Sequence, residues 1–343
     1  MSDKAFFKMD PVFETMGLLF VSYNLEEVKK ETKKGLSDVG IDGEQFYSKH
    51  FKTFDKYVQV FLKNRVESSE DAIFFSEKDS NYFLILLSLI IENKSWFTSL
   101  DCLTDDQVKS QLFHVCKTVF DEETNTGNPN TLEDIIQYLE SSVLESDAKW
   151  KMLRIMQKPM KYITQLIKII NSNMDAYFKA VNDVIKPLEK LLDQYNVLEI
   201  NHGDNKFYEL KNAISKSSVV YPTLIFPVSQ LLFVKSCYYG LLSDKAIKNG
   251  KIGHNSRELL LLKLKALSDS SKLGIISSLK VSPKYNLEIA QQLGLTAATM
   301  SHHMNVLLNC GLVGVEKKDG KVYYHLKKEN LQDLIRELEE TLL

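Results

Sequence analysis

The spacing of hydrophobic residues predicts helices over most of residues 10–200. Apolar side chains recur at every third or fourth position, as on one face of a helix, in four long stretches: Asn81–Trp96, Thr104–Phe120, Thr131–Leu144 and Pro159–Leu192. The expected helix starts agree with this pattern. Thr104 is followed three residues later by Gln107, and Thr131 by Asp134, as in capping boxes.

Prolines and one polar segment divide this helical region. Pro159 suits a first helical turn, where its missing N–H needs no partner. Pro187 predicts an end or a kink near Lys186. The polar segment Asp121–Asn130 predicts a loop.

After residue 201 the pattern becomes that of short strands. Val219–Val234 is rich in β-branched and aromatic residues, and Pro222 and Pro227 favour edge strands or strands with bulges. Cys237–Leu242 predicts a further short strand, and the polar stretch Lys248–Ser256 predicts a linker. We therefore expect a large, mainly helical N-terminal domain with a small β portion over 1–250, and a second domain over 256–343.

The second domain begins with four expected helices. Arg257–Leu267 forms the first, and Ser268–Ser270 ends it and caps another that runs to about Lys280. Leu287–Leu293 is a short helix, which Gly294 ends in a left-handed conformation. Thr296 caps a further helix to about Asn309, so a helix-turn-helix is predicted.

A β-hairpin follows these helices. Leu312–Lys317 and Lys321–Leu326 alternate around Asp319-Gly320, a dipeptide typical of two-residue hairpin turns. A helix-turn-helix with a hairpin is a winged helix. A last helix over Asn330–Leu342 carries an apolar stripe, formed by Leu331, Leu334, Ile335, Leu338 and Leu342.

Charge is unevenly distributed along the chain. The 343 residues carry a net charge of −2, with 44% hydrophobic and 26% charged residues, which is ordinary for a folded globular protein. Residues 257–328 hold eleven Lys and Arg against five Asp and Glu, a net charge of +6, which leaves −8 for the remainder. Basic charge concentrated on one small domain is what phosphate binding requires.

Other features indicate a cytoplasmic protein. The four cysteines, Cys102, Cys116, Cys237 and Cys310, show no CxxC spacing and predict reduced thiols. Met1–Phe13 has no apolar run long enough for a signal peptide. The apolar segment Tyr82–Ile91 is too short to span a bilayer and predicts a buried helix, so we expect no membrane association.

Residues 264–326 resemble the ArsR-type bacterial repressors. The resemblance rests on LKALSDSSKLGIISSL (Leu264–Leu279), LEIAQQLGLTAATMSHHMNVLLNCGLV (Leu287–Val313) and VEKKDGKVYYHL (Val315–Leu326). It implies a DNA-binding transcriptional regulator that acts as a repressor. It also implies a homodimer in which the helix near Arg257 and the last helix form the interface. The alternative is that the apolar stripe of the last helix packs on the chain's own N-terminal domain.

The expected recognition helix has one buried and one exposed face. Met300, Met304, Leu307 and Leu308 fall at core spacing. We expect the opposite face and the wing to contact double-stranded DNA through Thr296, Ala297, Ala298, Thr299, Ser301, His302, Asn305, Lys317, Lys318 and Lys321. The alternative is a winged helix that makes protein contacts only.

A metal site is not expected. The family's metal sensors carry a Cys-x-Cys pair in the first helix of the helix-turn-helix, or Asp and His pairs in the last helix. In this chain, the residues at the place of the Cys-x-Cys pair are Leu287-Glu288-Ile289-Ala290, which include no cysteine. The last helix has neither histidine nor cysteine. We therefore expect a regulator that is not metal-responsive and has no cofactor.

Residues 1–250 show no catalytic motif. They contain no Gly-rich phosphate loop, no GxSxG and no HExxH, so an enzyme is not expected. Aromatic residues recur at helical spacing and favour a hydrophobic core. They are Phe6, Phe7, Phe46, Tyr47, Phe51, Phe54, Tyr57 and Phe61. We expect a sensor or oligomerisation domain whose effector, a small molecule or a protein, is unknown. The alternative is an enzyme or a protein-docking domain that the winged helix only localises.

Overall fold

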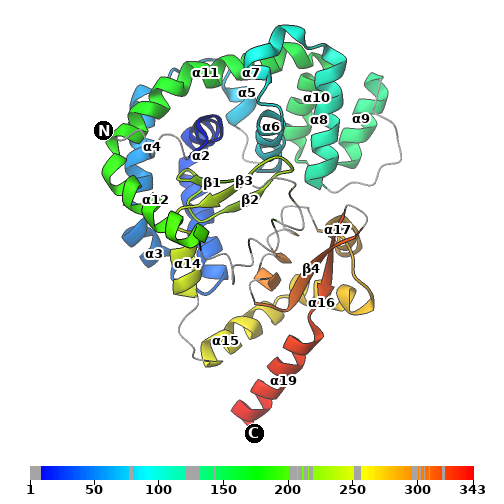
Figure 1. The fold of residues 1–343 in the computed structure, drawn as a ribbon. Helices are drawn as coiled ribbons and strands as arrows, with labels where there is room; N and C mark the ends of the chain where they lie inside the picture. Colours follow the sequence, from blue (N-terminus) through cyan, green and yellow to red (C-terminus); the bar gives the residue numbers. More distant parts are fainter. Residues whose placement is uncertain are drawn as a thin grey trace.

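The structure is a computed structural model that describes residues 9–343 except 77–79, 121–130, 143, 201–206, 208–210, 212–214, 216–218, 251–255, 296–299, 301–302, 305, 309 and 319–320. Its larger part is mainly helical (Figure 1). The helices of this part are α2 (Pro11–Asp38), α3 (Gly43–His50), α4 (Lys52–Asn64), α5 (Ala72–Phe75), α6 (Ser80–Glu92), α7 (Trp96–Ser99), η1 (Leu100–Cys102), α8 (Asp105–Phe120), α9 (Leu132–Ser141), α10 (Ser146–Gln157), α11 (Pro159–Asp183), α12 (Ile185–Ile200) and α14 (Ser243–Gly250).

The predicted helix starts are confirmed by hydrogen bonds. The Thr131 hydroxyl accepts from the N–H of Asp134 (3.1 Å), and the Asp134 carboxylate accepts from the N–H of Thr131 (2.9 Å). Thr104 and Gln107 make the same reciprocal pair before α8, at 3.3 and 3.0 Å. Both pairs satisfy backbone N–H groups that lack a partner within the helix.

The prolines act at helix starts. Pro159 is the first residue of α11, as predicted. The break expected near Lys186 lies two residues earlier, at Val184, between α11 and α12. Pro187 therefore lies in the first turn of α12, where its missing N–H costs no helical hydrogen bond.

A small sheet covers one side of α2 and is made of β1 (Val220–Thr223), β2 (Gln230–Leu232) and β3 (Cys237–Gly240) (Figure 1). The strand order is β1-β3-β2, with β1 parallel and β2 antiparallel to β3. Pro222 lies in β1, which is an edge strand, as predicted for a residue without a backbone N–H. The strand expected from Cys237 is β3.

The linker predicted over Lys248–Ser256 overlaps the helices on both sides of it. Helix α14 continues to Gly250, and the next helix begins at Ser256. The prediction was wrong because the apolar side of α14 is short. Ala246 is buried in the core, whereas most of the helix is polar. Residues 251–255 lie outside the described residues.

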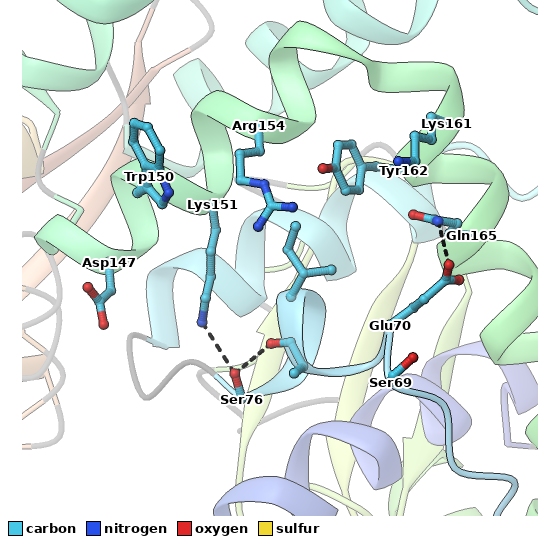
Figure 2. A pocket seen from close by; sticks show the side chains of 12 residues that line it. Ser69, Glu70, Ser76, Asp147, Trp150, Lys151, Arg154, Lys161, Tyr162 and Gln165 are labelled. Atoms are coloured by element: carbon cyan, nitrogen blue, oxygen red, sulfur yellow. Dashed lines mark hydrogen bonds between the residues drawn. The ribbon is translucent and has the colours of Figure 1, made fainter.

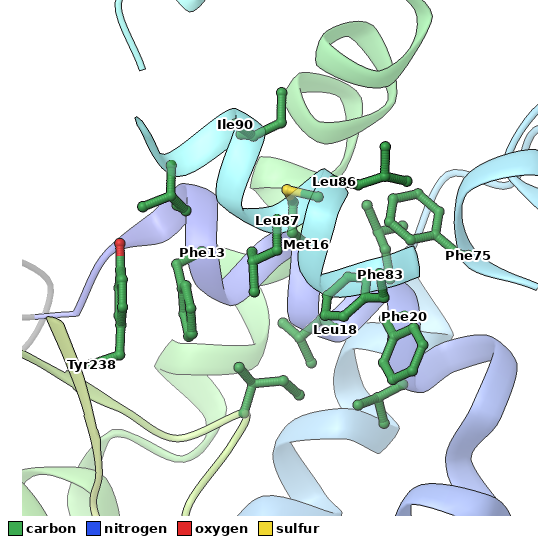
Figure 3. Packing of buried hydrophobic residues seen from close by; sticks show 14 of the residues in the cluster. Phe13, Met16, Leu18, Phe20, Phe75, Phe83, Leu86, Leu87, Ile90 and Tyr238 are labelled. Carbon is green, nitrogen blue, oxygen red and sulfur yellow. The ribbon is translucent and has the colours of Figure 1, made fainter. Parts of the chain in front are cut away.

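Buried hydrophobic residues form two separate clusters. The first draws on residues from Met9 to Ala246, and the second on residues from Leu260 to Leu334. In the first cluster, α6 packs against α2, and the ring of Phe20 stacks on that of Phe83 at 4.1 Å (Figure 3). In the described part of the chain, no single helix is long and apolar enough to cross a membrane, although the bent pair Asn81–Glu92 and Trp96–Cys102 passes that test together.

The aromatic residues between Phe46 and Phe61, which were predicted to lie in the core, are buried. They are Phe46, Tyr47, Phe51, Phe54, Tyr57 and Phe61. Phe6 and Phe7 lie outside the described residues. These rings pack between α2, α3 and α4, so their helical spacing reflects packing in the core.

A fully buried carboxyl group connects α2 to the sheet. Glu14 accepts hydrogen bonds from the hydroxyls of Thr223 and Tyr57 (2.9 Å for Tyr57), and from the backbone N–H groups of Leu224 (3.1 Å) and Ile225 (3.2 Å). Burial raises the pKa of Glu14 to about 7, although all four hydrogen bonds act to lower it. Thr223 is 209 residues away along the chain, so this group fixes a long-range contact.

Asp10, one turn earlier, makes a second connection. Its carboxylate caps α2 by accepting from the N–H groups of Val12 (3.2 Å) and Phe13 (3.5 Å). It also accepts from the hydroxyl of Tyr238 and from the ammonium group of Lys94. The Tyr238 ring stacks on Phe13 with centroids 3.6 Å apart (Figure 3), so α2 is held against β3 by polar and aromatic contacts together.

Glu14 predicts that stability falls as pH rises towards neutrality. Because the pKa is about 7 in the folded chain and 4.5 without burial, the folded state binds the proton more tightly. The contribution of Glu14 to the free energy of unfolding is therefore fully present below pH 4.5. It decreases by about 3 kcal/mol as pH rises from 4.5 through the folded-state pKa of about 7, and it stays constant once Glu14 is ionised in both states.

Urea denaturation at pH 5, 6, 7 and 8 measures this effect. Tryptophan fluorescence reports on the larger part of the chain, because Trp96 and Trp150 are the two tryptophans of the sequence. Glu14→Gln should abolish this pH dependence, whereas Glu26→Gln, an exposed position on the same helix, should retain it. An unchanged pH profile in Glu14→Gln contradicts the assignment.

Candidate nucleic-acid interface

The second hydrophobic cluster holds together a compact set of C-terminal elements. They are α15 (Ser256–Leu267), α16 (Ser270–Val281), α17 (Asn286–Leu293), β4 (Val313–Lys318), β5 (Lys321–Leu326) and α19 (Lys328–Leu342). The mainly helical fold with a C-terminal winged helix agrees with the prediction.

Helix α16 begins at a charged cap, as predicted from Ser268–Ser270. The Asp269 carboxylate accepts from the backbone N–H of Lys272 at 2.9 Å. This hydrogen bond is the main reason that the pKa of Asp269 is lowered. The carboxylate therefore stays charged at neutral pH, where it also complements the positive end of the helix dipole.

Gly294 ends α17 in the left-handed conformation that the sequence predicted, with φ of 64°. The N–H of Leu295 donates to the carbonyl of Ala290 at 2.9 Å, and that of Gly294 donates to Gln291 at 3.4 Å. This is the hydrogen-bond pattern of a Schellman motif, which turns the chain sharply. The turn brings the chain from α17 to the helical residues that follow.

The buried face of the predicted recognition helix is confirmed. Met300, Met304 and Leu307 are fully buried, and Leu308 is partly buried against the same cluster. Val306 is also buried, which the helical spacing did not predict. The described residues of this segment, 300, 303–304 and 306–308, are helical.

Most of the predicted DNA contacts lie outside the described residues. They are Thr296, Ala297, Ala298, Thr299, Ser301, His302 and Asn305. The wing residues Lys317, Lys318 and Lys321 are described in their backbone alone. Lys318 pairs with Lys321 across the hairpin, which leaves a two-residue turn between β4 and β5, as predicted.

The wing is connected to the start of α17. The backbone of Lys284 pairs with that of Tyr324 through two hydrogen bonds of 3.0 and 2.7 Å. Beside this bridge the rings of Tyr285 and Tyr323 meet edge to face, with centroids 6.1 Å apart. The wing therefore cannot move freely relative to α17.

Three polar side chains hold α16 and α17 together. The Ser278 hydroxyl donates to the Gln292 carbonyl oxygen at 2.7 Å. The Lys284 ammonium group donates to both, at 3.1 Å to Ser278 and 2.9 Å to Gln292. This group was not predictable from the sequence, because no short-range spacing relates α16 to α17 through these residues.

The apolar stripe of α19 has a part that packs in the second cluster and a part that is exposed to solvent. Leu334 is buried and Leu331 and Leu338 pack against the second cluster, where α19 contacts α15. Ile335 is 56% exposed, and Leu342 is more exposed still, as is Leu261 on α15. The alternative that the whole stripe packs on the N-terminal region is wrong, because these side chains face solvent. Figure 1 shows α15 and α19 side by side at the end of the molecule.

Comparisons with known proteins match this C-terminal part. The sequence model described as "Bacterial regulatory protein, arsR family" matches residues 269–315, which include α16, α17 and the start of β4. Much of the chain, including all of α2 to α14, lies outside this match. No solved structure matches the chain.

Three curated proteins illustrate the similarity. The arsenical resistance operon repressor of Staphylococcus aureus is 35% identical over 75 residues, which are 22% of this chain and 72% of that protein. The HTH-type transcriptional regulator CmtR of Mycobacterium tuberculosis is 33% identical over 88 residues, 25% of this chain and 75% of that protein. The transcriptional repressor SdpR of Bacillus subtilis is 31% identical over 71 residues, 21% and 79% respectively.

The family match covers α16, α17 and the Gly294 turn described above, and it ends at the start of β4. The resemblance expected from the sequence is therefore confirmed. The chain belongs to the arsR family of bacterial regulatory proteins, and it is a DNA-binding transcriptional regulator.

Proposed function

We propose that this regulator binds a pseudo-palindromic operator as a homodimer and represses transcription there. The recognition helix is residues 296–309 and the wing is residues 315–326. The order of the elements supports this proposal most directly. Helix α16, the Gly294 turn and the helical segment that buries Met300 are followed by a hairpin with lysines at its tip. This arrangement supports insertion of a helix into the major groove with the wing beside it.

In this proposal each predicted contact has a physical role. Asn305 pairs with adenine through two hydrogen bonds, Ser301 reaches base edges, and Ala298 meets a thymine methyl group. Thr296, Ala297, Thr299 and His302 contact the groove edge and the phosphates. The wing lysines at 317, 318 and 321 neutralise neighbouring phosphates, in keeping with the +6 charge of residues 257–328.

Exposed apolar side chains support the homodimer. Leu261, Ile335 and Leu342 come from α15 and α19, which contact each other. A twofold interface built on these helices would cover side chains that solvent otherwise surrounds. It would place the recognition helices about one DNA turn apart, roughly 10 base pairs from centre to centre.

We also propose that the protein is not metal-responsive and needs no cofactor. Residues 287–290 contain no thiol where sensors of this family have one, and α19 offers carboxylates but no histidine or cysteine. The two separate hydrophobic clusters support a division into residues 1–250 and 256–343. We assign the first, which lacks a catalytic motif, to sensing or oligomerisation in the cytoplasm.

Replacing Lys317, Lys318 and Lys321 together by alanine should weaken binding to every DNA sequence. The slope of log affinity against log salt should fall by up to about three, because each lysine displaces about one counterion. Fluorescence anisotropy of a labelled duplex at several salt concentrations measures it. Alanine at Lys168, Lys179 and Lys190, exposed lysines on α11 and α12, is the matched control. An unchanged slope in the wing variant excludes the wing assignment.

Selection of duplexes from a random pool tests sequence recognition. The wild-type protein should enrich an inverted repeat with half-sites one helical turn apart. Asn305→Ala should lose the preference at one base pair of each half-site while general affinity is kept, because a base contact is removed and phosphate contacts remain. No enrichment by the wild-type protein, with binding abolished by moderate salt, would contradict sequence-specific repression.

Ile335→Glu should dissociate the proposed dimer. A carboxylate buried without a partner in an apolar interface is costly, and Ile335 is exposed within the chain, so folding should be unaffected. Sedimentation should show a monomer, with affinity for a two-half-site duplex reduced about a hundredfold. Arg336→Gln changes the charge by the same amount at the neighbouring exposed position and should remain dimeric. A dimeric Ile335→Glu variant would place the interface elsewhere.

A further inference from the structure

A groove on the N-terminal region combines an exposed tryptophan with several cations. It has a volume of about 550 Å³, within the range of sites for small ligands, and it lies between α5, α10 and α11 (Figure 2). Trp150 lines it with 64% of its surface exposed. Lys151, Arg154 and Lys161 line it as well. Among the described residues Trp150 is the most exposed aromatic side chain, so its indole ring is accessible to a ligand in the groove.

The cations on the groove wall are held by an aromatic ring. The Arg154 guanidinium carbon lies 6.0 Å from the centroid of Tyr162, and the Lys161 ammonium group lies 5.5 Å from it. The Tyr162 ring is itself buried and meets Phe74 edge to face, so it is a fixed support. Two positive charges are therefore placed beside one aromatic ring.

Few carboxylates compensate this charge. Glu70 lines the groove but accepts a hydrogen bond from Gln165 at 2.9 Å (Figure 2). Across the described residues, neither Arg154 nor Lys161 forms an ion pair with an acidic side chain. Asp147 is the other acidic residue of the lining, which therefore carries three cations against two carboxylates.

The helix geometry relates the aromatic and cationic positions. Trp150 and Arg154 are four residues apart on α10, so their Cβ atoms lie about 5–6 Å apart on one face. Figure 2 shows Trp150, Lys151 and Arg154 projecting from the same side of this helix. A planar ring stacked on Trp150 would thus present an attached anionic group to Arg154, which can bind it with two parallel hydrogen bonds.

We propose that this groove binds a small aromatic anion, with its ring on Trp150 and its phosphate or carboxylate on Arg154 and Lys161. Nucleotides and aromatic acids share this chemistry. Binding at the groove is independent of DNA recognition. The regulatory role, in which the ligand changes affinity for the operator, rests on the proposed function.

Tryptophan fluorescence of the full-length protein without DNA tests the site. Because Trp96 is buried, quenching by a ligand in the groove reports on Trp150. Adenosine 5′-monophosphate and 4-hydroxybenzoate are the probes, and they distinguish a nucleotide from an aromatic acid. At least one should quench saturably. Adenosine, benzyl alcohol and inorganic phosphate, which each lack the ring or the anion, should bind at least about tenfold more weakly.

Arg154→Gln should raise the Kd of the bound probe about tenfold or more, because a charged pair of hydrogen bonds is lost. Lys168→Gln removes one charge from an exposed position of α11 outside the groove and should leave the Kd unchanged. Calorimetry on Trp150→Ala should show the same loss as Arg154→Gln. Failure of both probes at 10 mM (about a hundredfold above a useful effector affinity), or equal binding by the Arg154→Gln variant, overturns the proposal.

The effect of the ligand on DNA binding is measured in a separate experiment. Binding of the selected duplex is measured with and without a saturating probe, and a change in affinity of about fivefold or more is expected. If a probe binds the groove but leaves DNA affinity unchanged, the ligand is not an effector, although the proposed binding site stands. Absence of any DNA binding refutes the proposed function instead, while the quenching experiment still decides the ligand site.

Discussion

The buried carboxyl group of Glu14 is the constraint on which the N-terminal region depends. A carboxyl group removed from water costs several kcal/mol unless its oxygens find donors. Its donors come from Tyr57 on α4 and from residues 223–225 at the end of β1, so α2, α4 and the sheet must assemble together. Asp10 adds Tyr238 of β3 from the same helix. The short sheet, too small to be stable alone, is thereby fixed on the helical core.

Features that depend on neighbouring residues were predictable from the sequence. The Thr131–Asp134 capping box, the left-handed Gly294 and the two-residue hairpin turn all involve residues within about five positions of each other. Their physics is local, and residue type reveals it. The buried Met300 face was likewise predictable, because helical periodicity determines which residues point inward.

Long-range contacts were not predictable. No pattern in the sequence relates Glu14 to Thr223, or places Lys284 between Ser278 and Gln292. The stripe on α19 was found from spacing, but its division into a packed side and an exposed side depends on where α15 lies. The groove at Trp150 had no sequence signal, since its lining comes from three helices. Helix α14 was missed because a single buried alanine is too weak an indication of amphipathicity.

The short connection between α14 and α15 has a mechanical consequence. Helix α14 ends at Gly250 and α15 begins at Ser256, so at most about 20 Å of fully extended chain separates them. Such a tether limits how far the N-terminal region can travel before it pulls on α15. Helix α15 packs against α19, and both carry the exposed apolar side chains. A displacement of the large region would therefore exert a force on the exposed apolar surface of α15 and α19, which is the surface proposed for the homodimer.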